Sequence, residues 1–469
     1  MYRKITAPSS RPIQTRFTAR YRQRAFPVAL FLFLAACGAP KPEVGLVGNV
    51  KGFFGAAIVE EPRAALVARD VLSSGGTAAD AATAAFFTMS VTYPVAVGLG
   101  GGGVCLYFDQ AANKTETLDF RVGPVAVGGP VGIPGAVRGM ALLHSRYGRL
   151  PWSQLVAPAE TMARFGHQIS RALAQRLASQ AARLRGDAMA ARIFLHTDGS
   201  PLGEADKIVQ VELAAVLTRV RTRGVSDIYG GEAGQQLVRA GYAAGGKVTI
   251  DQLRQYRANW RGTRATVLGN HMLHHPDLDP HPDRVPGENA AQQLTRLMAG
   301  MSAGKAADKV FSQEDLDRTD DRGEGAFVIG DSFGSAAACV FSMNGAFGRG
   351  VMAPGLGIFM ASAANQDGAA AGGGGANPLP LLGVNDPVGQ AVMAAVGAGG
   401  PNGALAAAAV ALGVMDKDQT LDQAMTARAA IKGGRVQALW CALGIRTTPK
   451  SCRFATDPRG HGLASFDKF

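Results

Sequence analysis

The sequence has few of the residues that mark metal sites, disulfide scaffolds or disordered chains. Its 469 residues include five cysteines and eight histidines, and only 18% of the positions are charged. No Cys/His spacing fits a metal, and the prolines in a His/Asp cluster over residues 274–283 favour a solvated loop. We therefore expect neither a metal nor a cofactor. With 47% hydrophobic residues the chain is globular, and its length suffices for a large layered core.

The sequence also lacks an uninterrupted apolar run of about 18 residues, so no helix is expected to span a membrane. A short apolar run, residues 28–34, follows 26 residues that carry seven basic side chains and no acidic one, which is typical of an export signal. The run ends in Leu34-Ala35-Ala36-Cys37-Gly38, which is similar to the lipobox of bacterial lipoproteins. We expect residues 1–36 to be removed and Cys37 to carry lipid; an ordinary signal peptide with a chance cysteine is the alternative.

The positive charge is concentrated in this leader. Removing its seven cations lowers the net charge from +12 to +5 for residues 37–469, so the pI of 9.7 is weak evidence for nucleic acid. We expect no nucleic-acid partner, and contact with the membrane only through the lipid. Residues 37–48 are expected to be a tether that holds the protein in the bacterial cell envelope, facing the periplasm.

Four cysteines remain once Cys37 is assigned to lipid. Cys441 and Cys452 bracket a turn-rich segment, and export to an oxidising space predicts a disulfide between them. Closing so short a loop would stabilise the fold by roughly 3 kcal/mol on the chain-entropy account. Cys105 and Cys339 lie in apolar, strand-like runs and are predicted to be buried, inert thiols.

Local patterns predict short strands among capped helices. A strand is expected at Phe53–Glu60, followed by a helix that begins near Pro62 and ends at Gly75-Gly76. Thr77 and Asp80 have the spacing of a capping box at the start of the next helix. Further helices are expected at Trp152–Phe165, Ser170–Leu184 and Val209–Arg223.

Two β-hairpins are expected in the last third of the chain. Apolar runs at 326–329 and 336–343 flank the turn-forming residues Gly330-Asp331-Ser332-Phe333-Gly334. Residues 436–440 and 452–456 predict a second hairpin near the C-terminus, which ends in Asp457-Pro458-Arg459.

Three ordered motifs give the chain its resemblance to a known family. They are Gly75-Gly76-Thr77-Ala78-Ala79-Asp80-Ala81-Ala82, the glycine run 98–103, and Leu118-Asp119-Phe120-Arg121. In this order and at similar spacing they resemble the gamma-glutamyltransferases (glutathione hydrolases), which are N-terminal-nucleophile hydrolases. The resemblance implies an α+β fold, a four-layer αββα sandwich with extra helices. It also implies a large-subunit-like region over residues 49–323 and a small-subunit-like region over residues 324–469.

The resemblance places an unexpected residue at the catalytic position. Matching Phe347-Gly348-Arg349-Gly350 to the family's Phe-Gly-x-Gly puts Glu324 where the nucleophilic threonine should stand. Family members cut their own chain before this residue, and the freed α-amino group acts as the base. A carboxylate cannot perform the N-to-O acyl shift, and the next residue, Gly325, offers no hydroxyl. Thr319, Ser332 and Ser335 are the nearby hydroxyls that could replace it.

The resemblance also implies which residues would bind a substrate. Arg121 matches the arginine that holds the γ-glutamyl carboxylate, although a structural salt bridge to Asp119 or Asp331 is an equal alternative. Ser342 and Asn344 match a Thr-x-Asn motif. Gly399 and Gly400 match the oxyanion-hole glycines. Other family side chains are lost, because their positions fall on Ala363, Gln366 and Pro380-Leu381.

These substitutions favour a non-catalytic member of the family, unprocessed and lipid-anchored, with a binding or structural role in the cell envelope. Its partner would be a γ-glutamyl or amino-acid-like small molecule. The alternative is an active γ-glutamyl hydrolase or transferase that acts on glutathione or related compounds through a displaced nucleophile. Whether the protein is an enzyme therefore depends on Glu324.

Overall fold

The structure of the protein is a computed structural model that describes residues 54–125, 128–278, 323–363 and 378–466. The predicted leader 1–36, the lipidated Cys37 and the tether 37–48 lie outside the described residues, as do Thr319 and Gln366. Within the described ranges, no helix is both long and apolar enough to cross a membrane.

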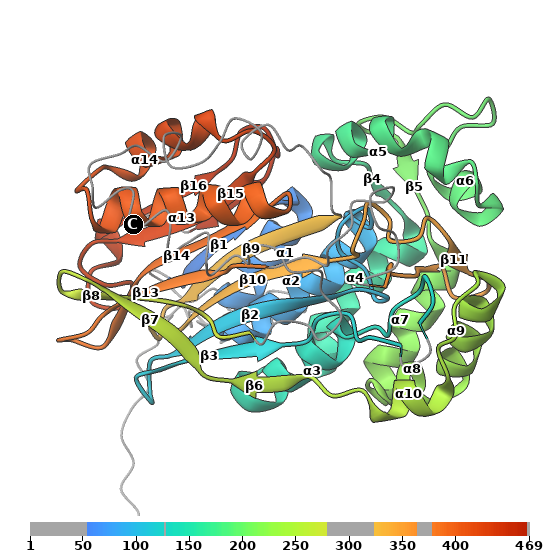
Figure 1. Ribbon diagram of the computed structural model, residues 1–469, viewed down its shortest axis with the longest axis horizontal. Coiled ribbons are helices and arrows are strands. Elements are labelled where there is room, and N and C mark those ends of the chain that lie inside the picture. The colour runs from blue at the N-terminus through green and yellow to red at the C-terminus, as the bar shows by residue number, and fades with distance from the viewer. Residues whose placement is uncertain (1–53, 126–127, 279–322, 364–377, 467–469) are drawn as a thin grey trace, which may run out of the picture. The chain divides into compact units, whose positions relative to one another are not determined.

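Two antiparallel sheets form the centre of the fold (Figure 1). The first sheet has the order β17-β1-β9-β10-β2-β3-β6 and the second has the order β16-β15-β14-β13-β8-β7. The first contains β1 (Gly55–Val59), β2 (Gly102–Asp109), β3 (Lys114–Asp119), β6 (Asn259–Arg261), β9 (Glu324–Asp331), β10 (Ala336–Ser342) and β17 (Leu463–Phe466). The second contains β7 (Thr263–Leu268), β8 (His271–Pro276), β13 (Leu381–Asn385), β14 (Gln390–Ala398), β15 (Arg435–Cys441) and β16 (Cys452–Thr456).

Helices cover the outer faces of both sheets. Those that precede β6 in the chain are α1 (Pro62–Ser73), α2 (Ala78–Thr92), α3 (Ala136–Tyr147), α4 (Trp152–Phe165), α5 (Arg171–Leu184), α6 (Ala188–Phe194), α7 (Val211–Arg223), α8 (Ser226–Gly230), α9 (Glu232–Ala243) and α10 (Ile250–Gln255). Later in the chain, α13 (Pro401–Met415) and α14 (Leu421–Ala427) pack on the second sheet. Short strands β4 (His167–Gln168), β5 (Lys207–Ile208), β11 (Met352–Ala353) and β12 (Ile358–Phe359) form two small ribbons.

The alternation of side chains along β9 explains the layers. Ala326 and Val328 belong to the cluster that fills the space between the two sheets. Phe327 and Ile329 point to the other face and join the cluster under the helices. Because successive strand residues face opposite sides, one wholly buried apolar strand supplies both cores. The result is the predicted αββα arrangement.

Local predictions agree closely with these elements. The strand β1, the helices α1 and α4, and both hairpins are where the sequence predicts them. Thr77 and Asp80 form the predicted capping box at α2, and all fifteen residues of this helix are buried. The His/Asp cluster is a correction, because His274 and His275 belong to β8 and not to a solvated loop. The rest of that cluster, from residue 279, lies outside the described ranges.

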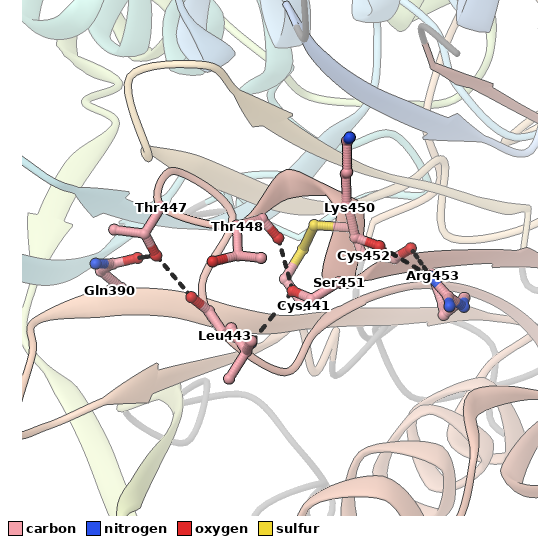
Figure 2. The surroundings of a disulfide bond; sticks show 9 residues. All are labelled: Gln390, Cys441, Leu443, Thr447, Thr448, Lys450, Ser451, Cys452 and Arg453. Carbon is pink, nitrogen blue, oxygen red and sulfur yellow. Dashed lines mark hydrogen bonds between the residues drawn. A yellow bond between two sulfur atoms is a disulfide. The ribbon is translucent and has the colours of Figure 1, made fainter. Parts of the chain in front are cut away.

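Both pairs of cysteines form disulfides. Cys441 and Cys452 face each other across β15 and β16, as predicted, with an S–S distance of 2.00 Å (Figure 2). Cys105 and Cys339 were expected to be free buried thiols, and that expectation is wrong. They pair in register across β2 and β10 and are joined by a disulfide, with a Cα–Cα distance of 4.1 Å. The apolar runs indicated the two strands, but not that they are neighbours.

Candidate functional site

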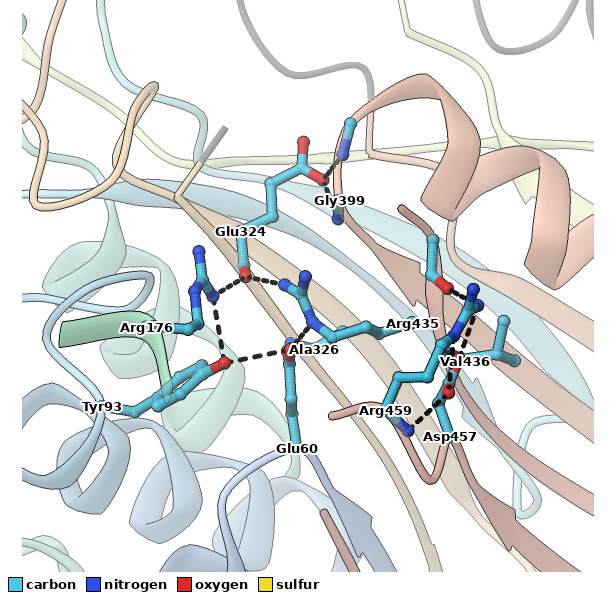
Figure 3. A network of polar contacts seen from close by, with 12 residues as sticks. Glu60, Tyr93, Arg176, Glu324, Ala326, Gly399, Arg435, Val436, Asp457 and Arg459 are labelled. Carbon is cyan, nitrogen blue, oxygen red and sulfur yellow. Dashed lines mark hydrogen bonds and ion pairs between the residues drawn. The ribbon is translucent and has the colours of Figure 1, made fainter. Parts of the chain in front are cut away.

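Glu324 is the first residue of β9 and its side chain is buried, with 2% of the residue exposed. Its Oε2 atom accepts hydrogen bonds from the backbone N–H groups of Gly399, at 2.9 Å, and Gly400, at 2.6 Å (Figure 3). The structure thus brings together three residues that the sequence singled out. Gly400 is the N-cap of α13, so the carboxylate lies at the positive end of a helix.

The shape of the Gly399-Gly400 turn requires glycine. Gly399 has a φ of +113° and Gly400 a φ of +70°, in the region that other residues rarely occupy. A Cβ on Gly399 would lie 2.3 Å from the carbonyl oxygen of Gly433. This conformation directs both N–H groups at the same oxygen, which is the geometry needed to stabilise a negative charge.

A buried network holds the main chain at Glu324 (Figure 3). The carbonyl oxygen of Glu324 accepts hydrogen bonds from Arg176 of α5 and Arg435 of β15, each at 3.2 Å. Arg435 also forms an ion pair with the fully buried carboxylate of Glu60, which follows β1. Tyr93 links the two arginines, because it accepts from Arg176 at 3.0 Å and donates to Glu60 at 3.2 Å. Burial raises the pKa of Tyr93 to about 12, so the phenol remains protonated.

The sequence alone does not reveal this network. Glu60 and Arg435 are 375 residues apart, and no local pattern marks either of them as a site residue. The second carboxylate oxygen of Glu60 accepts from the N–H of Ala326, at 3.2 Å, which also ties the network to β9. The effect is to fix the start of β9 from three different elements.

The C-terminal Asp457-Pro458-Arg459 motif has a structural part in this region (Figure 3). Asp457 is fully buried and forms ion pairs with Arg428, at 2.6 Å, and Arg459, at 3.1 Å. It also accepts from the N–H of Val436, at 3.4 Å, next to Arg435. Burial raises the pKa of Asp457 although the charge of Arg428 opposes this. The motif therefore positions the strand that carries Arg435.

Ser342 and Asn344 also lie beside Glu324. Ser342 is the cross-strand partner of Glu324 in the β9–β10 register. Its hydroxyl accepts from the N–H of Asn344, at 2.9 Å, while the Asn344 side chain donates to the carbonyl oxygen of Ser362, at 2.9 Å. Asn344 has a φ of +53°, which asparagine tolerates better than most residues. A hydroxyl is thus directly across the ladder from the carboxylate.

Arg121 makes the structural salt bridge that the sequence left as an alternative. Its Nε and Nη2 atoms donate to the two oxygens of Asp119, at 2.9 and 2.8 Å. Burial alone would raise the pKa of Asp119, but the bonds and charge of Arg121 outweigh it and hold the pKa below its ordinary value. The Nη1 atom is buried and has no hydrogen-bond partner within the described ranges. This atom leaves the arginine able to donate to a further acceptor.

Other predicted positions lie elsewhere or outside the described chain. Ser332 and Ser335 flank the turn at the opposite end of the β9–β10 hairpin from Glu324. Strand β9 has eight residues, which at about 3.3 Å each separate its two ends by roughly 25 Å. Neither serine therefore lies near Glu324. Among the residues that the structure describes, no group of three His, Cys, Asp or Glu side chains is arranged for a metal ion.

The first half of the chain is similar in sequence to known proteins. Residues 64–281 match the model of the family described as gamma-glutamyltranspeptidase. The chain is 34% identical over 243 residues to glutathione hydrolase 7 of Bos taurus, covering 49% of this chain and 36% of that protein. It is also 34% identical over 230 residues to the glutathione hydrolase proenzyme of Pseudomonas aeruginosa, covering 44% of this chain and 40% of that protein. The match thus spans well under two thirds of these relatives.

The similarity in structure extends much further along the chain. The crystal structure of cephalosporin acylase from Bacillus halodurans superposes with a TM-score of 0.67 over 92% of this chain and 99% of that one, at 18% identity. At this identity the likeness concerns the fold alone. The predicted N-terminal-nucleophile hydrolase fold, with two antiparallel sheets flanked by helices, is confirmed.

Proposed function

We propose that this chain, which is similar in sequence to the gamma-glutamyltranspeptidases over residues 64–281, is a non-catalytic member of that family. In this proposal the chain is not cut before Glu324, and the protein has a binding or structural role in the cell envelope. The observation that carries the proposal is the contact between the Glu324 carboxylate and the N–H groups of Gly399 and Gly400.

The chemistry of position 324 supports the loss of activity. Self-cutting and acyl capture need a hydroxyl or thiol next to an α-amino group, whose ordinary pKa is near 8. A carboxylate is a weak nucleophile and cannot transfer the preceding acyl group to itself in the way a threonine does. Gly325 follows it, so the neighbouring position offers no substitute.

The surroundings of Glu324 support the same conclusion. In a working hydrolase of this kind, paired N–H groups stabilise the oxyanion that forms on the substrate. Here the chain's own carboxylate occupies Gly399 and Gly400. Each hydrogen bond to a charged group contributes about 1.5–3 kcal/mol, so a substrate carbonyl would have to displace two strong bonds. The site is therefore blocked as well as lacking a nucleophile.

Two further features support the binding role and the location. The Nη1 atom of Arg121 has no hydrogen-bond partner among the described residues, which suits a carboxylate of a γ-glutamyl or amino-acid-like ligand. The two disulfides suit an oxidising compartment, in line with export by the leader and a lipid on Cys37.

The mass of the mature protein tests the proposal. We expect one uncut polypeptide that starts at Cys37 with its lipid, and no hydrolysis of a chromogenic γ-glutamyl anilide. Two fragments, the smaller beginning with a hydroxyl or thiol residue, would overturn it.

The register between Ser342 and Glu324 gives the alternative function a specific candidate nucleophile. If the purified protein does turn over the anilide, Ser342→Ala should abolish the activity while Ser335→Ala, at the far end of the hairpin, should not. Loss in Ser342→Ala alone would identify an active γ-glutamyl hydrolase with a displaced nucleophile.

A further inference from the structure

A polar hollow lies at the turn of the β9–β10 hairpin, away from Glu324. It has a volume of about 520 Å³, and we call it the turn hollow. Its walls come from the start of α2, the end of β2, the residues after α3, the hairpin turn and the loop after β15. The residues that matter here are Gln110, Arg146, Arg149, Asp331, Phe333 and Arg446.

Two of the three arginines in the turn hollow have no acidic partner in the described part of the chain. Arg146 forms an ion pair with Glu116, at 2.6 Å, which Lys114 also contacts. No ion pair involves Arg149 or Arg446 among the residues that the structure describes. Exposed cations that are not neutralised by a neighbouring carboxylate are available to bind an anion.

The positions of these two arginines are set by the hairpin turn. The guanidinium of Arg149 lies 4.1 Å from the ring centroid of Phe333. A Cβ added at Gly334 would lie 3.1 Å from the Cβ of Arg446 and 2.8 Å from Oε1 of Gln110. The turn therefore holds both arginines and the glutamine around one small space.

The carboxylates that line the turn hollow, Asp331 and Asp109, accept hydrogen bonds from main-chain N–H groups. Asp331 is buried and accepts from the N–H groups of Ala78, Phe333 and Ser335, at 2.8 to 3.0 Å. Asp109 accepts from the N–H of Ala111, at 3.0 Å. Burial also raises the pKa of Asp331 to about 6, so part of its charge is absent in mildly acidic solution. These carboxylates thus offset the arginines only in part.

Gln110 supplies an acceptor that still lacks a donor. Its Nε2 atom donates to the carbonyl oxygen of Gly389, at 2.7 Å, which fixes the orientation of the amide because the reverse would place two oxygens together. Its Oε1 atom is buried and accepts no hydrogen bond within the described ranges. An unpaired buried acceptor favours a ligand that carries a proton.

We propose that the turn hollow binds a hydrogen phosphate group, with its oxyanions on Arg149 and Arg446 and its hydroxyl donated to Oε1 of Gln110. Hydrogen phosphate has both the double charge that two guanidinium groups favour and the proton that the amide oxygen lacks. Sulfate has the same charge and a similar size but no proton. The site is independent of Glu324 and of the proposed function.

Calorimetric titration of the full-length protein with inorganic phosphate tests the site. We expect saturable binding with a Kd on the order of 1 mM. The double variant Arg149→Gln/Arg446→Gln should bind at least about tenfold more weakly. The control variant Arg69→Gln removes one partly exposed arginine that is paired with Asp70, and should bind within about twofold of the natural protein. Arg149 and Arg446 are exposed and Arg69 is partly exposed, and near-ultraviolet circular dichroism would verify that the variants fold.

Sulfate and Gln110→Met test the part played by the proton. The natural protein should prefer phosphate to sulfate, and Gln110→Met should remove that preference while retaining sulfate affinity. Glycerol 1-phosphate distinguishes free phosphate from a monoester, because tighter binding of the monoester would assign the site to the phosphate of a larger molecule. Absence of saturable phosphate binding, or equal affinity in the double variant and Arg69→Gln, would overturn the proposal.

Discussion

The two ends of strand β9 are held by similar hydrogen bonds but from different kinds of partner. At each end a buried carboxylate accepts hydrogen bonds from backbone N–H groups near the start of a helix. Glu324, at the beginning of the strand, binds Gly399 and Gly400 at α13. Asp331, at its end, binds Ala78 of α2 together with two N–H groups of its own turn. Hydrogen bonds to a buried carboxylate thus hold the strand at both of its ends.

The two ends of the strand differ in the residues that their carboxylates contact. Asp331 serves the turn, because two of its partners lie within four residues and would otherwise be unpaired donors. Glu324 has long-range partners, because Gly399 and Gly400 lie 75 and 76 residues away in the sequence. Asp331 thus stabilises a local turn, whereas Glu324 joins β9 to the start of a helix 76 residues further along the chain.

The largest expected effect comes from removing the anchor at the Glu324 end. Arg435→Met leaves the buried carboxylate of Glu60 without its ion pair and removes one donor to the carbonyl oxygen of Glu324. We expect the free energy of unfolding to fall by about 3–5 kcal/mol, measured by urea denaturation. Arg69→Met, which breaks an exposed pair, should cost about 1 kcal/mol or less.

The double variant Glu60→Gln/Arg435→Met sharpens this prediction. It removes the uncompensated carboxylate of Glu60, so it should recover a large part of the stability lost in Arg435→Met. If Arg435→Met costs no more than Arg69→Met, the network does not hold the start of β9.

At the other end of the strand, the expected effect depends on pH. Burial raises the pKa of Asp331 to about 6, above its ordinary value of 3.8. The folded state therefore binds the proton more tightly than the unfolded state, so stability is fully present below about pH 4 and is lost as the pH rises through 6. A shift of this size corresponds to about 3 kcal/mol.

Asp331→Asn isolates this effect, because asparagine does not titrate. The difference in unfolding free energy between the natural protein and Asp331→Asn should change by about 2–2.5 kcal/mol between pH 4 and pH 7, in favour of the variant at high pH. Urea denaturation at several pH values measures it. A constant difference would show that Asp331 titrates normally.

The sequence predicted the contacts around the Asp331 end of β9 much better than those around the Glu324 end. The reason is physical. The hairpin, the capping box of α2 and the Cys441–Cys452 disulfide depend on residues close together in the chain. The Cys105–Cys339 disulfide and the Glu60–Arg435 pair join residues separated by 234 and 375 positions. Local propensity contains no information on which strands become neighbours. The nearness of Glu324 to Gly399 and Gly400 could be expected only through the family resemblance.

The smallest expected effect comes from neutralising Glu324 while its shape is retained. In Glu324→Gln the amide oxygen can still accept from Gly399 and Gly400, but the bonds lose their charge assistance and the helix its favourable charge. We expect a loss of about 1–2 kcal/mol in urea denaturation, with little dependence on salt because the group is buried. Glu324→Thr, which leaves both donors without the carboxylate, should lose more. If Glu324→Gln were instead more stable than the natural protein, the cost of burying the charge would exceed the strength of the two hydrogen bonds. The carboxylate at position 324 would then not serve to stabilise the fold, and a role in binding would have to explain it.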